Sequence, residues 1–335
     1  MSNHVFAWHT PAFEALGARV TALPHALLLH GRSGVGKTVF ARAFAAWLLC
    51  EGNRSAVAAC GQCEACRWFE QGNHPDFRQI EPEFLSVERG IEGEASERTK
   101  DPSKQIKIEQ VRELQSFLAV GTHRAGRRVA LVRPAEAMNT ATANALLKSL
   151  EEPPPNTLFL LVSSQPARLL PTIRSRCQLV SLPAPTAEVA IEWLATQGMQ
   201  QDAQSLLAHC GNAPLAAMEA ADQADSRNRL LSQLARGESD PLVLTDACTG
   251  AEPVQVIDWL QKWTYDLAAV TLIGAPRYHP QASASLQKIG PRLALRRLLG
   301  FQRDLARSRA VAQHPLNPRL FLEDIFMRYR ALRER

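Results

Sequence analysis

The chain has 335 residues, of which 46% are hydrophobic and 21% are charged, and its formal net charge is +5. This composition excludes a disordered or low-complexity protein and predicts a globular chain with an ample core in two or three domains. A charge of +5 is too small to indicate nucleic-acid binding by itself. Since the sequence shows neither a signal peptide nor a long apolar segment, we expect a cytoplasmic protein with no membrane association.

The first predicted elements surround a phosphate-binding loop. An apolar run at 26–30 predicts a buried strand, and the segment 38–49, rich in Ala, Leu, Phe and Trp, predicts a helix. Between them lies the motif G-x-x-x-x-G-K-T, formed by Gly31, Arg32, Ser33, Gly34, Val35, Gly36, Lys37 and Thr38. In such loops backbone N–H groups surround phosphate, the lysine reaches the β- and γ-phosphates, and the threonine hydroxyl binds Mg²⁺. The motif predicts an ATP or ADP site, against the alternative of a glycine-rich turn with an exposed lysine.

Four of the seven cysteines follow this helix with the spacing C-x9-C-x2-C-x2-C: Cys50, Cys60, Cys63 and Cys66. Two intervening residues let successive thiolates turn toward one centre, and four thiolates suit tetrahedral Zn²⁺. Because disulfides are rare in a reducing cytoplasm, we favour a structural zinc module over two disulfides. A closed site of four thiolates leaves no open position for catalysis.

Two polar segments come next. Residues 83–103 are polar and aperiodic, which predicts a loop or a partly disordered insertion, before helical spacing resumes at 106–118. The turn at 121–128 is basic, and we favour a solvated turn there over a contact with DNA phosphates.

The strand predicted at 129–132 lacks the acids that ATP hydrolysis requires. Hydrolysis in such folds needs an Asp that holds Mg²⁺ and usually a second acid that positions water. The two residues after this strand are Arg133 and Pro134, so the sequence does not support Mg²⁺ binding. Glu136 follows shortly, and we expect its side chain to point away from the site. The alternative is that the strand is misassigned and the true acid lies elsewhere.

The region 144–177 completes a recognisable series of motifs. An amphipathic helix at 144–152 stops at three prolines, and a buried strand at 157–162 ends at Ser163 and Ser164, where a polar sensor is expected. The triplet Ser175-Arg176-Cys177 follows. Together with the phosphate loop, the four-cysteine insertion and the stretch N-A-L-L-K-S-L-E-E-P-P, this order resembles bacterial DNA polymerase III clamp-loader subunits of the AAA+ class, over nearly the whole chain.

The resemblance implies a role within a ring of subunits. Motor subunits (γ/τ) of this family keep the strand-end acids and a sensor arginine in the lid, whereas δ′ subunits do not need them. Here Arg133 and Pro134 replace the acids and Pro214 replaces the lid arginine, which favours δ′. The resemblance further implies that Arg176 is an arginine finger for a neighbouring ATP site. From the residues alone, a surface arginine in a weak ion pair is the simpler interpretation.

The resemblance also implies the domains and the partners. We expect an α/β P-loop AAA+ ATPase-like domain at 1–182 with an inserted zinc module at 50–66, a small helical lid domain at 183–224 and an all-α C-terminal collar domain at 225–335. The implied partners are the motor subunits and δ in a pentameric ring, and the sliding clamp and primer-template DNA through the assembled complex.

Two other functions stay open at this point. One is an active motor-type clamp-loader ATPase with a displaced acid. The other is a protein that binds nucleic acid directly through its zinc module. The second is disfavoured, because no strongly basic helix and no interleaved aromatic residues lie beside the cysteines.

Overall fold

The computed structural model describes residues 5–88, 102–123, 126–199, 202–312 and 317–333. The chain divides into two compact units, Met1–Ala184 and Pro185–Arg335. Among the described helices, none has the length and apolarity needed to cross a membrane.

The first unit is built on five parallel strands in the order β2-β3-β4-β1-β5. The strands are β1 (Ala26–His30), β2 (Phe77–Ile80), β3 (Arg128–Val132), β4 (Thr157–Ser163) and β5 (Gln178–Ser181). Every residue of β3 and β4 is buried, as expected for parallel strands covered on both faces. The carboxyl ends of β1, β3 and β4 therefore meet at one edge of the sheet.

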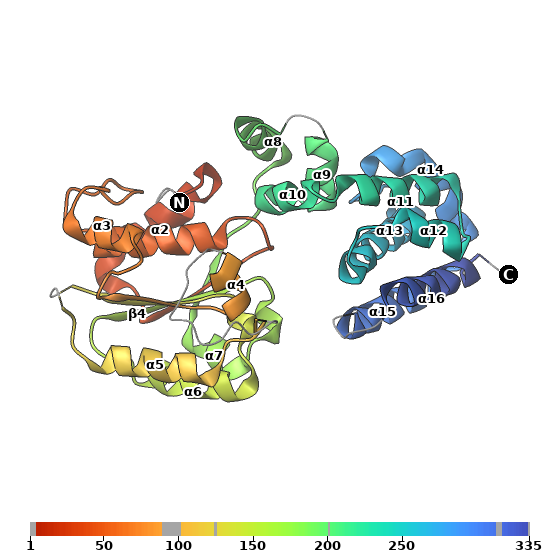
Figure 1. Ribbon diagram of the computed structural model, residues 1–335. Coiled ribbons are helices and arrows are strands. Elements are labelled where there is room, and N and C mark those ends of the chain that lie inside the picture. The colour runs from red at the N-terminus through yellow and green to blue at the C-terminus, as the bar shows by residue number, and fades with distance from the viewer. Residues whose placement is uncertain (1–4, 89–101, 124–125, 200–201, 313–316, 334–335) are drawn as a thin grey trace. The chain divides into compact units, whose positions relative to one another are not determined.

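Helices cover both faces of this sheet (Figure 1). The helices of the unit are α1 (Thr10–Gly17), α2 (Lys37–Leu49), α3 (Glu64–Glu70), α4 (Glu83–Glu88), α5 (Ile108–Ala119), α6 (Thr140–Glu151) and α7 (Pro171–Arg176). One apolar core joins α1, α2 and α3 to the strands, and a second core on the other face joins α5, α6 and α7 to them. The predicted α/β fold with a parallel sheet is confirmed.

The polar segment predicted as a loop is only partly described. Its first residues form the short helix α4, so the prediction of a loop was wrong there. The carboxylate of Glu83 accepts a hydrogen bond from the backbone N–H of Ser103 and pairs with Lys107. The first residue of the segment is therefore bonded to its last. The stretch 89–101 lies outside the described residues.

The basic turn contributes less free charge than its sequence suggests. Arg128 is 2% exposed and donates to the carbonyl oxygens of Phe117 and Gly121. Its guanidinium also lies 3.7 Å from the buried carboxylate of Asp76. Arg127 donates to the carbonyl of Val20 at 2.5 Å. Arg128 therefore anchors the turn from inside and is not available to an external phosphate.

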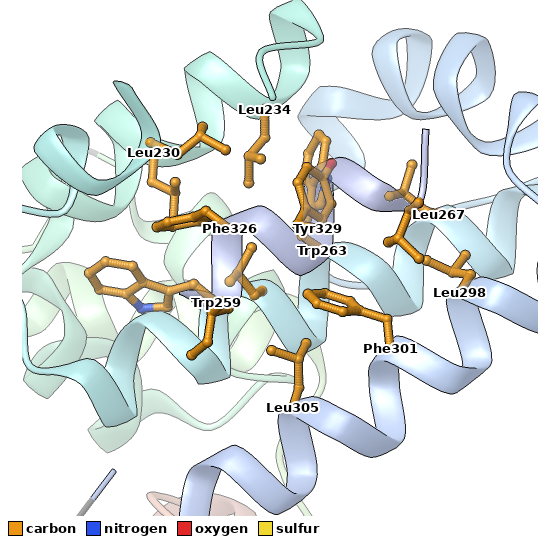
Figure 2. Packing of buried hydrophobic residues seen from close by; sticks show 14 of the residues in the cluster. Leu230, Leu234, Trp259, Trp263, Leu267, Leu298, Phe301, Leu305, Phe326 and Tyr329 are labelled. Carbon is orange, nitrogen blue, oxygen red and sulfur yellow. The ribbon is translucent and has the colours of Figure 1, made fainter. Parts of the chain in front are cut away.

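The second unit is helical and contains two apolar clusters, which confirms the helical C-terminal part. The smaller cluster joins α8 (Ala187–Thr196), α9 (Ala203–His209) and α10 (Pro214–Ala221). The larger one joins α11 (Ala224–Arg236), α12 (Pro241–Ala247), α13 (Pro253–Ile273), α14 (Ser283–Ile289), α15 (Leu295–Val311) and α16 (Pro318–Ala331). Figure 2 shows Phe301 of α15 and Tyr329 of α16 packed around Trp263 of α13, whose Nε1 donates to the Tyr329 hydroxyl at 3.1 Å.

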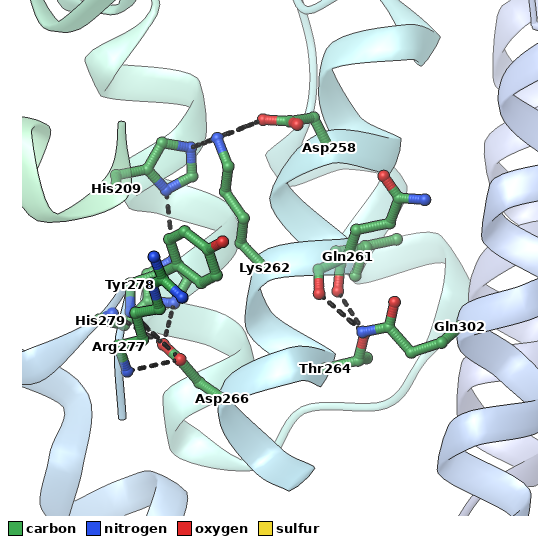
Figure 3. A network of polar contacts seen from close by, with 11 residues as sticks. His209, Asp258, Gln261, Lys262, Thr264, Asp266, Arg277, Tyr278, His279 and Gln302 are labelled. Carbon is green, nitrogen blue, oxygen red and sulfur yellow. Dashed lines mark hydrogen bonds and ion pairs between the residues drawn. The ribbon is translucent and has the colours of Figure 1, made fainter. Parts of the chain in front are cut away.

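A buried polar network joins the two clusters of this unit (Figure 3). His209 of α9 contacts His279 at 3.4 Å and Lys262 of α13 at 3.2 Å. The carboxylate of Asp266 accepts from the His279 ring at 2.9 Å and from the backbone N–H groups of Arg277, Tyr278 and His279. Burial lowers the pKa of His209, with the charge of Lys262 acting in the same direction. The network that connects the two clusters therefore contains a neutral His209.

Candidate functional site

The phosphate loop has the predicted strand–loop–helix geometry. It connects β1 to α2, whose first residue is Lys37. Gly34 and Gly36 have φ of 76° and 98°, in the left-handed region that favours glycine. A side chain at Gly31 would collide with the carbonyl oxygen of Leu182, which follows β5. These glycines therefore allow the loop to turn tightly beneath the end of the sheet.

The loop lysine is held by oxygens of the protein itself. Lys37 is 5% exposed, and its ammonium donates to the carbonyl of Arg32 at 2.6 Å and to the hydroxyl of Ser164 at 2.9 Å. Ser164 follows β4, at the position where a polar sensor was expected. Burial lowers the pKa of Lys37 to about 8, and the negative charge of Glu136 opposes this shift. A bound phosphate group would add an anionic partner for this lysine beside the charge of Glu136.

The expectation that Glu136 points away from the site was wrong. It lies in a 3₁₀ turn, Ala135–Ala137, and its Oε1 accepts the backbone N–H of Ser164 at 2.9 Å. Its Oε2 is buried and has no hydrogen-bond partner among the described residues. The Glu136 carboxylate therefore lies beside Ser164, whose hydroxyl accepts a hydrogen bond from Lys37.

Arg133 and a missed acid form an ion pair at the end of β3. Glu81 directly follows β2, is 3% exposed, and lies 2.6 Å from the Arg133 guanidinium. The same carboxylate accepts from Gln79 at 2.8 Å and from Ser86 at 3.0 Å. The sequence offered little signal for Glu81, because β2 (Phe77–Ile80) is apolar only at its two ends and contains no apolar run. Arg133 thus occupies the place after β3 where a metal-binding acid is expected, and Glu81 pairs with it.

An aromatic segment at the N-terminus also covers the loop, and the motifs did not predict it. The indole of Trp8 donates to the carbonyl of Val35 at 3.0 Å and stacks on Phe6, with ring centroids 4.6 Å apart. His9 is fully buried, and its Nε2 lies 3.3 Å from the carbonyl oxygen of Pro183. Burial lowers the pKa of His9 to about 4, so it is neutral near pH 7. These contacts link the loop to the segment that leaves the sheet after β5.

The four predicted cysteines converge. The Sγ atoms of Cys50, Cys60, Cys63 and Cys66 all lie within 4.8 Å of one another, and the Cys60–Cys66 pair is 3.9 Å apart. Bonds of about 2.3 Å to a tetrahedral Zn²⁺ place sulfur atoms about 3.8 Å apart. Backbone N–H groups of Gln62 and Cys63 lower the pKa of Cys60 to about 6, which favours a thiolate. The cluster can hold a metal ion, and its donor set fits zinc.

Arg176 lies at the last residue of α7, on the opposite side of the sheet from α2. Its side chain is 34% exposed and pairs with Glu151, the last residue of α6, at 2.6 Å. It also donates to the carbonyl of Thr172 at 2.9 Å. The structure thus does not bring Arg176 together with the phosphate loop of its own chain. These contacts hold the guanidinium at the partly exposed end of α7.

The comparisons with known proteins agree with one another. Residues 15–186 match the family model described as "DNA polymerase III, delta subunit". The chain is 37% identical to DNA polymerase III subunit delta′ of Pseudomonas aeruginosa, over 78% of this chain and 76% of that protein. It is 33% identical to the subunit delta′ of Haemophilus influenzae, over 72% and 70%.

Further similarities extend to other subunits. The chain is 36% identical to DNA polymerase III subunit tau of Escherichia coli, over 50% of this chain and 23% of that protein. A solved gamma subunit-related protein of DNA polymerase III from Thermotoga maritima is 18% identical, with a TM-score of 0.46, and the match covers 96% of this chain and 99% of that one.

Proposed function

The chain belongs to the family of DNA polymerase III delta′ subunits, and we propose that it is a non-hydrolysing member of the clamp-loader ring. Its role there is to support ATP-dependent loading of the sliding clamp onto primed DNA. The observation that carries the proposal is the ion pair between Arg133 and Glu81, at the position where hydrolysis requires a free acid. A guanidinium there repels Mg²⁺, and the acid beside it is already paired.

The phosphate loop keeps a nucleotide-binding role in this proposal. The backbone of Gly31 to Thr38, the ammonium of Lys37 and the N-terminus of α2 supply what a di- or triphosphate requires. Thr38 supplies a hydroxyl, but no strand-end acid completes a metal site. The expected ligand is therefore ATP or ADP, bound with little dependence on Mg²⁺.

Arg176 acts in trans in this proposal. Its partial exposure and its distance from its own phosphate loop support contact with a neighbouring subunit. A guanidinium supplied from outside stabilises charge on a transferring phosphoryl group. The receiving partner is a motor subunit, γ or τ, and the ring also contains δ. The sliding clamp and primer-template DNA are reached through the assembled complex.

The remaining parts have structural roles. The cysteine module holds a structural Zn²⁺ that closes the chain between α2 and α3. Residues 183–224 form a lid and residues 225–335 form a collar that assembles the ring. The two apolar clusters of the second unit support this division.

A direct test is the ATPase rate of the purified chain beside its nucleotide affinity. We expect ADP and ATP to bind with affinities that change less than about threefold when Mg²⁺ is removed, and we expect no turnover above background. Lys37→Ala should abolish binding. Turnover that is lost in Lys37→Ala would instead establish an active ATPase.

One observation favours that second candidate, an active motor-type subunit. The unpartnered Oε2 of Glu136 lies near the loop lysine, so this carboxylate is the best-placed substitute for the missing acid. Glu136→Gln separates the candidates. It removes turnover from an active enzyme, whereas in a non-hydrolysing subunit it only changes nucleotide affinity.

A further inference from the structure

The positive charge of this chain is concentrated in one segment of the second unit. Seven of the 38 basic residues and one of the 33 acidic residues lie between Lys288 and Arg309. This segment therefore carries a net charge of +6, and the rest of the chain carries −1. Most of the segment is helix α15.

Three arginines of α15 lie on one exposed face. Arg296, Arg303 and Arg307 have the spacing i, i+7 and i+11, which places them within about 40° of one another around a helix. All three are exposed. The opposite face carries Leu298, Phe301 and Leu305, which Figure 2 shows pointing into the apolar core. That core fixes the rotation of the helix, so the arginine row is a permanent feature of this surface.

The row is largely free of internal partners. Within the described part of the chain, Arg296 and Arg303 make no ion pair, and Arg307 meets only Asp304, at 3.6 Å with 83% of its own side chain exposed. By contrast, Arg309 points to the other side of the helix and pairs with Asp258 of α13. The row extends about 16 Å at 1.5 Å per residue.

We propose that this face of α15 binds the phosphate backbone of duplex DNA without reading its sequence. Duplex DNA presents a negative charge about every 1.7 Å of its axis, so a straight row of this length faces many phosphates. Arginine matches phosphate with two parallel hydrogen bonds. The only aromatic residue of α15 is the buried Phe301, so the face lacks the stacking rings typical of single-strand sites.

The contact goes beyond the proposed ring function, which reaches DNA only through the assembled complex. The test uses the full zinc-loaded chain alone, so its outcome does not depend on clamp loading. Binding to a labelled duplex of about 20 base pairs is measured over a salt series, beside a single strand of equal length and polyglutamate. We compare wild type with Arg296→Gln/Arg303→Gln. The matched control is Arg319→Gln/Arg328→Gln on α16, which removes the same charge from arginines already paired with acids.

Three phosphate contacts predict that log K falls with log salt at a slope of about −2.7, and the α15 variant should be shallower by about 1.8. The control should keep the wild-type slope. Arg296→Lys/Arg303→Lys retains both charges and should keep most of the affinity, which distinguishes lost contacts from misfolding. The proposal is overturned if the duplex does not bind at low salt, if both glutamine variants change the slope equally, or if the single strand or polyglutamate binds more tightly than the duplex.

Discussion

Arg133 donates from Nε and Nη2 to the same carboxylate oxygen of Glu81, at 2.7 and 2.6 Å. The two residues follow neighbouring strands, whose last residues, Val132 and Ile80, lie side by side in the parallel register. The pair is mostly buried, with Arg133 16% exposed and Glu81 3% exposed. An arginine at the end of β3 is thus matched by an acid at the end of β2, so a change to either charge alters the balance of this buried pair.

The Arg133–Glu81 pair predicts that removal of one buried charge strongly lowers the stability of the protein. Glu81→Gln keeps the shape of the side chain but removes the buried negative charge that pairs with the Arg133 guanidinium, and we expect the unfolding free energy to fall by about 3 kcal/mol. Urea unfolding measures it. The double variant Glu81→Gln/Arg133→Met removes the stranded charge and should recover most of this loss.

Glu83→Gln, two residues along, is the matched control. Glu83 pairs with Lys107 at 2.6 Å, but both side chains are more than 40% exposed, so its loss should change stability by less than about 1 kcal/mol. Equal decreases of the unfolding free energy in Glu81→Gln and Glu83→Gln would show that the buried pair stabilises the protein no more than the exposed one.

The lowered pKa of Lys37 predicts that nucleotide binding takes up a proton. Without nucleotide, burial lowers the pKa of the Lys37 ammonium to about 8. Bound phosphate favours the charged form of the lysine and raises that pKa. Above about pH 8, binding must therefore protonate Lys37, so affinity falls as pH rises. Calorimetry at about pH 9 in two buffers of different ionisation enthalpy measures the uptake. Lys37→Arg stays charged and should show none, so uptake that persists in this variant would assign the proton elsewhere.

Local patterns were sufficient to predict the elements that carry motifs. The apolar runs at 26–30 and 129–132 are buried strands because both faces of the sheet are covered, and the glycines around Lys37 admit only a tight loop. The spacing of the four cysteines brought them together as expected because three of them lie within seven residues, where local geometry dominates.

Contacts between distant segments could not be read in the same way. Arg133 meets Glu81 across 52 positions, and Trp8 reaches Val35 across 27. Such pairs depend on strand order and on where the N-terminal segment packs, which single-chain periodicity does not contain. The position of Glu136 likewise depends on a contact 28 positions away, where its carboxylate accepts from the backbone N–H of Ser164.

The cysteine cluster predicts one zinc ion per chain. Chelation at neutral pH should release one Zn²⁺ and expose four additional reactive thiols, which two disulfides would not do. Gly52 offers a subtler test, because a Cβ there would lie 2.7 Å from Cys60 Sγ. Gly52→Ala should therefore weaken zinc affinity by about tenfold or more without removing a ligand.

Gly61→Ala and Cys210→Ser are the controls for the zinc experiment. Among the described residues, no atom lies within 4 Å of a Cβ at Gly61, although its φ of 71° strains any side chain there. Gly61→Ala therefore shows the effect of backbone strain without a collision with a ligand. Cys210 lies outside the cluster and its loss should leave the zinc content unchanged. Full zinc affinity in Gly52→Ala would contradict the packing of Gly52 against Cys60.

We expect Arg176 to contribute strongly to the ATPase activity of the assembled loader and little to the stability of the chain. Its ion pair with Glu151 is partly exposed on both sides, so Arg176→Ala should change the unfolding free energy of the chain by less than about 1 kcal/mol. An arginine supplied in trans contributes about 10³- to 10⁵-fold in GTPases, so if Arg176 is the proposed finger, the motor site beside it should lose most of its turnover. Steady-state ATPase of the reconstituted loader with clamp and primed DNA measures the effect.

Two variants serve as controls for Arg176→Ala. Arg174→Ala removes an exposed arginine two residues away and should leave turnover near wild type. Glu151→Gln releases Arg176 from its internal partner while keeping the guanidinium, so a large loss in Arg176→Ala with little loss in Glu151→Gln assigns the effect to the finger. Equal turnover in wild type and Arg176→Ala would remove Arg176 from the mechanism.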